Sequence, residues 1–341
     1  MARVRTVTGD IDPAHIGQVA FHEHVLFDIV PPGAAGDRDT PIGPEDRWQV
    51  DYRSNEVPAN AHQTDVDVAI TELRRFAGDG GSLIVDQSVH GLARDAAGLA
   101  RAAEESGVRV VAAAGCYTEA YLSEPVLALD TDALTDRFVS EVTEGLDGTT
   151  IRAGLIGEIG CSWPMTAFER RAVQAGARAA VRTGASLSVH PGRAPEACAR
   201  ILDITEGEGL DPARTVLCHM DRTHPDGTGI AALLDRGACV EWDFFGIEQS
   251  HYWMGEVDLP MDRDRIRLIR HFAEAGHADR ILVSQDICTR TRLRRWGGHG
   301  YGHLMRNVIP LMRRLGCDVP LIDALLSANP IRLLTLEETL V

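Results

Sequence analysis

The sequence contains no lysine, so all 34 basic residues of this 341-residue chain are arginines. This absence excludes Schiff-base lysines, phosphate-loop lysines and carboxylated-lysine metal bridges. The arginines are outnumbered by 50 acidic residues, which leaves a formal net charge of -16. Such a negative balance argues against nucleic acid and anionic membranes as partners.

Paired cysteines and long apolar runs are also missing. The seven cysteines are odd in number and form no CxxC pair, which argues for reduced thiols and against a disulfide framework. No apolar run approaches the ~20 residues of a membrane span. The first residues, MARVRTVTGDI, lack the apolar core of a signal peptide. We therefore expect a cytoplasmic protein.

Short β-branched runs alternate with segments of helical spacing along most of the chain. We expect strands within residues 18–28, 82–86, 108–114, 153–158, 185–190, 215–219, 238–243 and 280–284. Strands this apolar are covered on both faces, as in a parallel sheet. Eight βα units in a chain of this length predict a (β/α)₈ TIM barrel, formed by a single domain over residues 1–341. A doubly wound sheet is the alternative, but no Gly-rich phosphate loop follows the early strands.

Polar residues at the ends of these strands carry the strongest functional signal. His22 and His24 flank Glu23, so both imidazoles lie on one face of the first strand. An HxH pair alone is a weak signal and is more typical of two half-exposed histidines at a strand end. Later strands, however, also end in imidazole or carboxylate groups, and in a barrel all these ends meet at one mouth. We therefore predict a metal site there, formed by His22, His24, Glu158, His190, His219 and Asp286.

Several local sequences resemble one known family. The segments GEIG, SVHPG, CHMDRT and LVSQD are similar to the phosphotriesterase-related branch of the amidohydrolase superfamily. The closing GGHGYGHLMRNVIPLMRRLG and NPIRLL are similar to that branch too, so the resemblance extends from Gly9 to Leu334. It covers nearly the whole chain.

The resemblance implies a site for two divalent metal ions. The HxH pair and Asp286 would hold one ion, His190 and His219 the other, and Glu158 would bridge them. The best-known members have a carboxylated lysine as the bridge, so a glutamate here implies metal loading that is independent of bicarbonate. Zinc suits these mixed ligands, and manganese, cobalt or iron fit them nearly as well.

Such a site predicts a binuclear metal-dependent hydrolase. Two ions about 3.5–4 Å apart share a water, which becomes hydroxide near neutral pH and attacks the substrate. Asp286 would accept its proton and pass it to the leaving group. The resemblance implies lactones, phosphoesters or N-acyl amides as substrates; we favour a lactone, carboxylic ester or amide, with phosphotriesterase activity as a side reaction.

Two other functions remain open at this point. A non-enzymatic small-molecule binding protein on the same barrel would be expected to have lost a ligand or the base, and all six residues are present. A mononuclear amidohydrolase gives Glu158 no natural role. The resemblance also implies a homodimer, which nothing in the sequence itself demonstrates.

Substrate contacts are expected from loops that follow the strands. Arg222 either clamps an anionic group of the substrate or forms a loop salt bridge with Asp221 or Asp226. The other candidates are Tyr117, the GGHGYGH loop with Tyr301 and His303, and, after the seventh strand, His251 and Tyr252. Surface or loop positions are expected for the remaining histidines considered, which are His62, His90, His224 and His277.

Overall fold

The structure is a computed structural model that describes residues 2–336, apart from 54–55, 249–251 and 253. Its centre is an eight-stranded sheet whose neighbouring strands are all parallel. The strands follow the chain in order: β3 (Gln18–Glu23), β6 (Gly81–Asp86), β7 (Arg109–Ala114), β8 (Leu155–Gly160), β9 (Leu187–His190), β10 (Thr215–Leu217), β11 (Cys239–Trp242) and β12 (Ile281–Val283).

The two edges of this sheet meet and nearly close it into a barrel. The Asp286 N–H, just after β12, donates to the carbonyl of His22 on β3 over 3.1 Å. The His22 N–H in turn donates to Ser284 Oγ over 2.9 Å. The predicted (β/α)₈ barrel is therefore confirmed, since a doubly wound sheet would place its first strand in the middle of the order.

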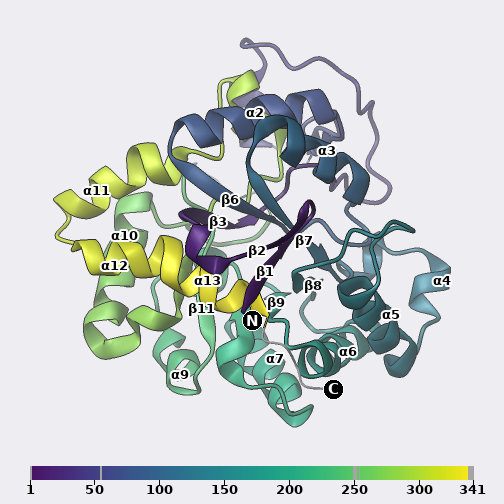
Figure 1. Cartoon of the computed structure of the whole chain (residues 1–341). Helices are drawn as coiled ribbons and strands as arrows, with labels where there is room; N and C mark the ends of the chain where they lie inside the picture. The colour runs from purple at the N-terminus through teal and green to yellow at the C-terminus, as the bar shows by residue number, and fades with distance from the viewer. Residues whose placement is uncertain (1, 54–55, 249–251, 253, 337–341) are drawn as a thin grey trace.

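Helices surround the barrel (Figure 1). Asp65, Asp95 and Asp130 each cap a helix by accepting bonds from its first N–H groups, and Thr166 forms a capping box with Glu169. The principal helices are α2 (Val66–Gly78), α3 (Ala96–Ser106), α5 (Thr131–Thr143), α6 (Ala167–Thr183), α7 (Pro195–Gly207), α9 (Ile230–Asp235), α10 (Asp262–Phe272), α11 (Ile309–Arg314), α12 (Val319–Asp323) and α13 (Asn329–Leu334).

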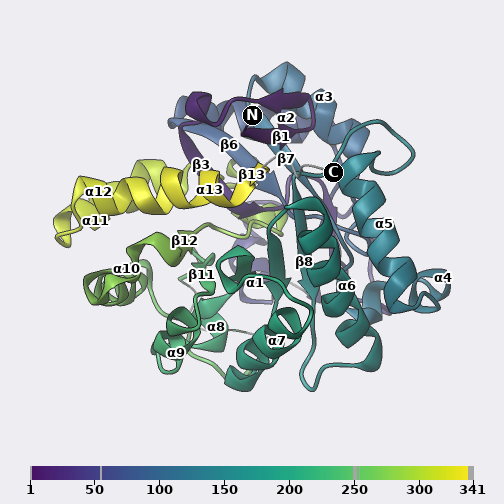
Figure 2. The same ribbon diagram turned by 60° about the horizontal axis from the view of Figure 1, so that its bottom comes forward.

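Smaller elements decorate this frame, joined by short 3₁₀ and π turns. They are β1 (Arg3–Thr6), β2 (Gly9–Ile11), β4 (Phe27–Asp28), α1 (Arg47–Tyr52), β5 (His62–Gln63), α4 (Glu124–Leu127), α8 (Met220–Thr223) and β13 (Thr335–Leu336). The strands β13, β1 and β2 form an antiparallel sheet that joins the two ends of the described chain (Figure 2). Among the described residues, none of the helices is long and apolar enough to cross a membrane.

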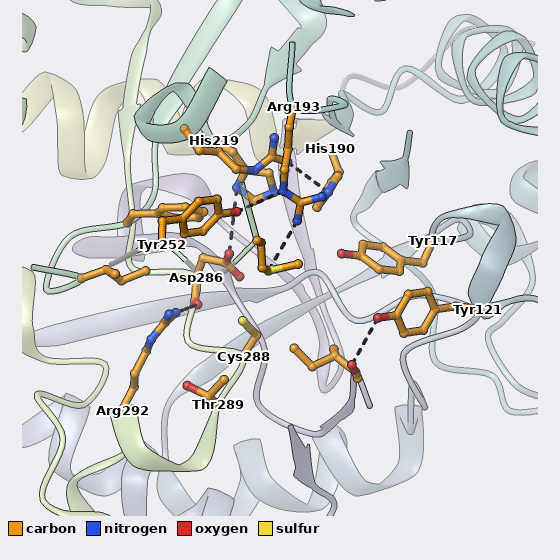
Figure 3. A pocket seen from close by; sticks show the side chains of 15 residues that line it. Tyr117, Tyr121, His190, Arg193, His219, Tyr252, Asp286, Cys288, Thr289 and Arg292 are labelled. Atoms are coloured by element: carbon orange, nitrogen blue, oxygen red, sulfur yellow. Dashed lines mark hydrogen bonds and ion pairs between the residues drawn. The ribbon is translucent and has the colours of Figure 1, made fainter. Parts of the chain in front are cut away.

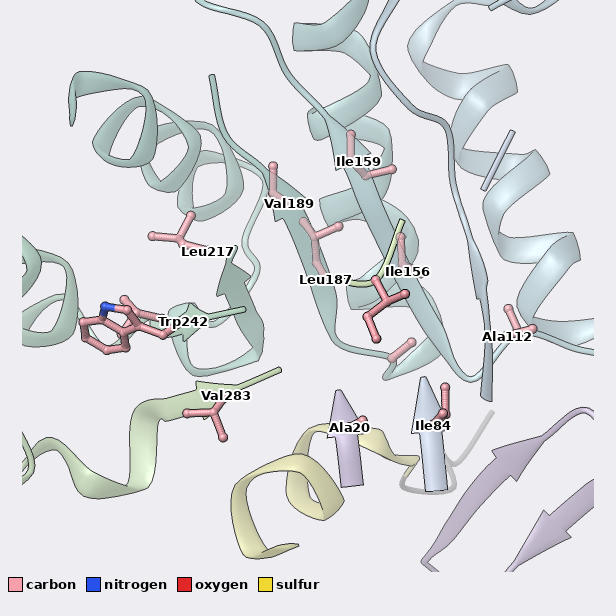
Figure 4. Close-up of a cluster of buried hydrophobic side chains, with 14 of the residues drawn as sticks. Ala20, Ile84, Ala112, Ile156, Ile159, Leu187, Val189, Leu217, Trp242 and Val283 are labelled. Atoms are coloured by element: carbon pink, nitrogen blue, oxygen red, sulfur yellow. The ribbon is translucent and has the colours of Figure 1, made fainter. Parts of the chain in front are cut away.

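The core has two apolar layers, one on each face of the sheet. Outward-facing strand residues such as Ala20, Ile84 and Val283 pack against the helices (Figure 4). A second cluster fills the barrel interior, where Val4 of β1 and Leu333 of α13 pack against strand residues. One end of the barrel is therefore closed by apolar contacts, which leaves the carboxyl ends of the strands as the open mouth.

Candidate metal centre

The six residues selected from the sequence converge at this mouth. Glu158, on β8, lies in the middle of four imidazole rings. Its Oε2 atom is 3.0 Å from His190 Nδ1, 3.4 Å from His219 Nε2 and 3.7 Å from His22 Nε2. Its Oε1 atom is 3.5 Å from His24 Nε2. All four histidines and Glu158 are buried.

One carboxylate is shared by two groups of potential ligands. His22 and His24 form one group with Glu158, and His190 and His219 form another with the same Glu158; within each group the ligand atoms lie within 4.8 Å of one another. Asp286 joins the first group, since its Oδ1 atom is 3.3 Å from His24 Nε2 and 4.0 Å from His22 Nε2. Glu158 is therefore the residue common to both groups.

Local backbone conformation brings these side chains over the mouth. His219 and Asp286 have positive φ angles of 58° and 45°, which turn the chain sharply as it leaves β10 and β12. The β3–β6 ladder shifts register between Ala20 and Glu23. Strict alternation would place His22 on the outward face with Ala20, so the irregularity accounts for its inward position. Gly157 is required before Glu158, because a Cβ atom there would collide with the Ser188 carbonyl.

A second set of residues contacts Nδ1, the ring nitrogen that faces away from Glu158, in His22, His24 and His219. Asp243 accepts from His219 Nδ1 over 2.9 Å with Oδ1, and its Oδ2 atom is 3.4 Å from His22 Nδ1. Glu241 Oε2 is 3.3 Å from the same His22 Nδ1, and Ser88 Oγ is 3.0 Å from His24 Nδ1. Such contacts fix the tautomer and orientation of metal-binding histidines. Sequence reasoning missed all three residues, although Glu241 and Asp243 are the charged residues at the end of a predicted strand.

The electrostatics at His190, His219 and Asp286 favour the protonation states that bind metal ions. The pKa values of His22 and His24 are raised instead, because neighbouring acidic groups outweigh the lowering effect of burial. Burial lowers the pKa of His190 to about 4. The negative charge of Glu158 raises this pKa, whereas the nearby Arg222 guanidinium lowers it further. Burial and the nearby His190 also hold the pKa of His219 well below its usual value. Burial would raise the pKa of Asp286, but the His24 hydrogen bond and nearby imidazoles outweigh it and lower the pKa to about 2. Neutral imidazole and charged carboxylate are the ligand forms.

A buried polar atom of the cluster that lacks a hydrogen-bond partner also supports a fit to a pair of divalent ions. His22 Nε2 is buried, points towards Glu158 and has no hydrogen-bond partner, which is costly for a polar atom. His190 Nδ1 and His219 Nε2 approach to 2.9 Å while both face the same carboxylate. A mixed nitrogen and oxygen donor set of this kind suits zinc or another first-row divalent ion.

Three residues of the cluster, His190, His219 and Asp286, line an open cavity of about 60 Å³ (Figure 3). Two of the expected substrate contacts, Tyr117 and Arg222, line it, and Tyr252 does so as well. The other lining residues are Ile29, Tyr121, Arg193, Phe244, Ile247, Met254, Cys288, Thr289 and Arg292. His251 lies outside the described residues.

Two expected substrate contacts are corrected by their positions. The Tyr301 side chain is fully buried away from the cavity, and its hydroxyl donates to the His24 carbonyl over 2.7 Å. His303 Nε2 is 2.8 Å from Asp262 Oδ2, and it does not line the cavity either. The Gly-rich loop folds back onto the barrel and packs, so its aromatic residues support the site from outside.

Two histidines expected at surface or loop positions lie outside the named helices and strands, as expected, and each has a specific partner. His224 is buried, with Nδ1 2.7 Å from the Thr228 carbonyl oxygen. His90 belongs to an ionic network, in which its Nε2 atom is 2.7 Å from Glu141 Oε1. Neither lies among the groups of potential metal ligands found within the described residues.

A (β/α)₈ barrel with clustered imidazoles and carboxylates at the carboxyl ends of its strands defines the class of metal-dependent barrel enzymes. The chain belongs to the phosphotriesterase family, whose model matches residues 2–334. It is 38% identical to N-acetyltaurine hydrolase from Homo sapiens over 341 residues, which cover 98% of each chain. The predicted family and the hydrolase class are thereby confirmed.

Solved structures agree with this assignment. A resiniferatoxin-binding protein from Rhodobacter sphaeroides matches with a TM-score of 0.91 and 37% identity, covering 97% of this chain and 94% of that one. A lactonase from Listeria monocytogenes matches with a TM-score of 0.81 and 26% identity, covering 98% of this chain and 100% of that one. The likeness extends in both cases over nearly the entire barrel.

Proposed function

We propose that this protein is a binuclear metal-dependent hydrolase that cleaves a carboxylic amide. The observation that carries the proposal is the position of Glu158, whose single carboxylate belongs to both groups of potential ligands. A mononuclear site would need only one of these groups. Asp286, which lines the cavity beside the cluster, supplies the carboxylate that a hydrolase needs for proton transfer.

Six residues would bind the metal ions, and one of them, Asp286, would also transfer the proton. His22, His24 and Asp286 would hold one ion, His190 and His219 the other, and Glu158 both. Two bound divalent ions supply Lewis acidity and a nucleophilic water at neutral pH. Asp286 is charged at that pH, because its pKa is about 2, and its side chain reaches the cavity. It accepts the proton released as water attacks and delivers it to the leaving amine.

Sequence similarity favours an amide over the lactone and phosphotriester alternatives. The hydrolases that act on N-acetyltaurine are 35–38% identical to this chain over 98% of its length. The lactonase structure is 26% identical. We therefore infer that an N-acyl amide such as N-acetyltaurine is the preferred substrate, and that lactone or phosphotriester cleavage is a side reaction. The resiniferatoxin-binding relative keeps the binding-protein function as the second candidate.

Metal counting combined with a substrate panel tests this function. Protein purified without chelators should contain close to two ions per chain by elemental analysis, with or without added bicarbonate. It should hydrolyse N-acetyltaurine faster than a γ-lactone or a phosphotriester, and dipicolinate should abolish each activity. About one ion per chain would remove Glu158 from the bridge. Two ions without hydrolysis of any substrate would favour the binding protein.

A further inference from the structure

Three arginines are buried among the described residues, and they differ in how their charge is compensated. Arg265 is ion-paired with Asp221 over 2.5 Å and with Asp262 over 2.7 Å. Arg222 and Arg292 are 4% and 8% exposed, and within the described chain neither has a carboxylate oxygen within 4.0 Å. Both line the cavity. A buried cation without an anion is costly, so the missing partner is expected from the cavity itself.

The contacts of Arg222 are all to neutral acceptors. Its guanidinium donates to the Pro191 carbonyl over 2.8 Å, to His190 Nε2 over 3.0 Å and to Thr223 Oγ1 over 3.3 Å. The salt bridges considered as its alternative role are not formed, because Asp221 is engaged by Arg265. An imidazole that binds a metal ion through Nδ1 carries its proton on Nε2. Were His190 to hold an ion through Nδ1, Arg222 would lose this acceptor.

Arg292 has a different task. The one described hydrogen bond of its guanidinium goes to the carbonyl of Asp286 over 3.0 Å, across the tight turn that carries this carboxylate. It thereby positions Asp286. Arg193, which also lines the cavity, is exposed at its rim and donates to the Tyr252 hydroxyl over 3.1 Å. Of the three arginines at the cavity, Arg222 is the one whose guanidinium contacts an imidazole of the cluster.

We propose that Arg222 binds an acidic group on the leaving amine of the substrate. The substrate class is then an N-acyl amine that ends in a sulfonate or carboxylate a short spacer away from the amide. The Arg222 guanidinium lies against the edge of His190 opposite to the one that faces Glu158, one ring width from the ligand cluster. Phe244 and Ile247 line the same cavity, and such apolar walls strengthen a charge-assisted hydrogen bond.

The proposal deepens the proposed amide hydrolysis and rests on it, so its test separates the two. N-acetyltaurine, N-acetyl-β-alanine and N-acetylethanolamine share the acetamide and the two-carbon spacer, and only the last is neutral. The selectivity is the kcat/KM for each acid divided by that for N-acetylethanolamine. We expect the unaltered enzyme to prefer both acids by about 100-fold, the usual effect of a buried charge-assisted contact.

Four variants assign this preference to a residue. R222M should reduce the selectivity by about 100-fold through KM, and R222K should restore part of it. R292M should lower kcat for acidic and neutral substrates alike and leave their ratio within about 3-fold. R170M, on the exposed surface of α6, is the matched control for loss of one arginine and should change neither. Metal content and circular dichroism are measured for every variant.

A binding measurement makes the result independent of turnover. Calorimetric titration of the metal-loaded protein with taurine and with ethanolamine should give binding of taurine that R222M weakens and R292M retains. Equal kcat/KM for acidic and neutral amides, or unchanged selectivity in R222M, would overturn the role of Arg222 and leave amide hydrolysis standing. If no amide is hydrolysed, the proposed function fails. The role of Arg222 is then decided by calorimetry alone, which should find tighter binding of N-acetyltaurine than of N-acetylethanolamine. Should R222M fail to fold, R222K and the substrate comparison decide.

Discussion

Asp243→Asn tests whether one buried carboxylate positions ligands of both ions. The Asp243 side chain touches the cluster only from behind, through His219 and His22. Its Oδ1 atom accepts from His219 Nδ1, while Oδ2 accepts from the His219 backbone N–H over 3.0 Å and faces His22 Nδ1 over 3.4 Å. An asparagine has the same shape and only one acceptor oxygen. Whichever way the amide turns, one ring loses its acceptor and faces an NH₂ group instead.

The magnitude follows from the role of such contacts. Loss of the residue that orients a metal-bound histidine costs about 10- to 100-fold in metal affinity, or about 1.4–2.7 kcal/mol. Because the rings held by Asp243 belong to different ligand groups, we expect both ions to bind more weakly. Glu241→Gln is the matched comparison. Glu241 lies within hydrogen-bonding distance of His22 and not of His219, so only one ion should be affected.

The assay is a competition of apoprotein against a chromogenic zinc chelator, with both dissociation constants fitted and folding checked by circular dichroism. D243N should shift both constants and E241Q one of them. Two unchanged constants in D243N would refute the idea that this carboxylate positions the ligands. A shift confined to one constant in D243N would place His22 and His219 on the same ion and refute the division of the cluster.

Three further predictions concern the reaction, the fold and the corrected loop. Asp286→Asn should lower kcat by about 10²–10⁴-fold while elemental analysis still finds bound metal, and near-normal kcat would exclude its proton-transfer role. Burial would raise the pKa of Glu141, but hydrogen bonds and charge from His90 and Arg94 lower it to about 2. Its contribution to stability is therefore complete above its ordinary pKa of about 4.5 and lost as pH falls towards about 2. Urea titrations should find E141Q about 3 kcal/mol less stable than the unaltered protein at pH 7, with the difference shrinking below pH 4.5; a pH-independent difference would contradict this. Tyr301→Phe should lower the free energy of unfolding by about 1 kcal/mol and leave KM unchanged, whereas a raised KM would return Tyr301 to the substrate.

The barrel and the convergence of the six ligand residues were predictable because both follow from one-dimensional patterns. Apolar runs such as 108–114 and 185–190 predict strands, and parallel strands in sequential order bring their carboxyl ends to one mouth. Position at a strand end then translates directly into position in space. His190 and Glu158 could be placed together in this way although they are 32 positions apart in the sequence.

Side chains whose role depends on long-range packing could not be placed. Tyr301 and His24 are 277 positions apart, and no local pattern indicates that a hydroxyl from the Gly-rich loop reaches the carbonyl beside the HxH pair. The inward position of His22 likewise depends on a shift in strand register. The HEH pattern predicted that His22 and His24 share one face of the strand, and the register shift decides that this face points into the barrel.

By itself the sequence determined the type of fold and the family and indicated which polar residues gather at the mouth, because these depend on residue types at regular spacings. Only the tertiary structure decided which charges are compensated. Arg222 and Arg265 are both buried arginines, yet Arg265 meets two carboxylates and Arg222 meets only neutral acceptors. Ion pairing is set by distances of a few ångströms between residues far apart in the chain, so it is fixed only when the barrel has closed.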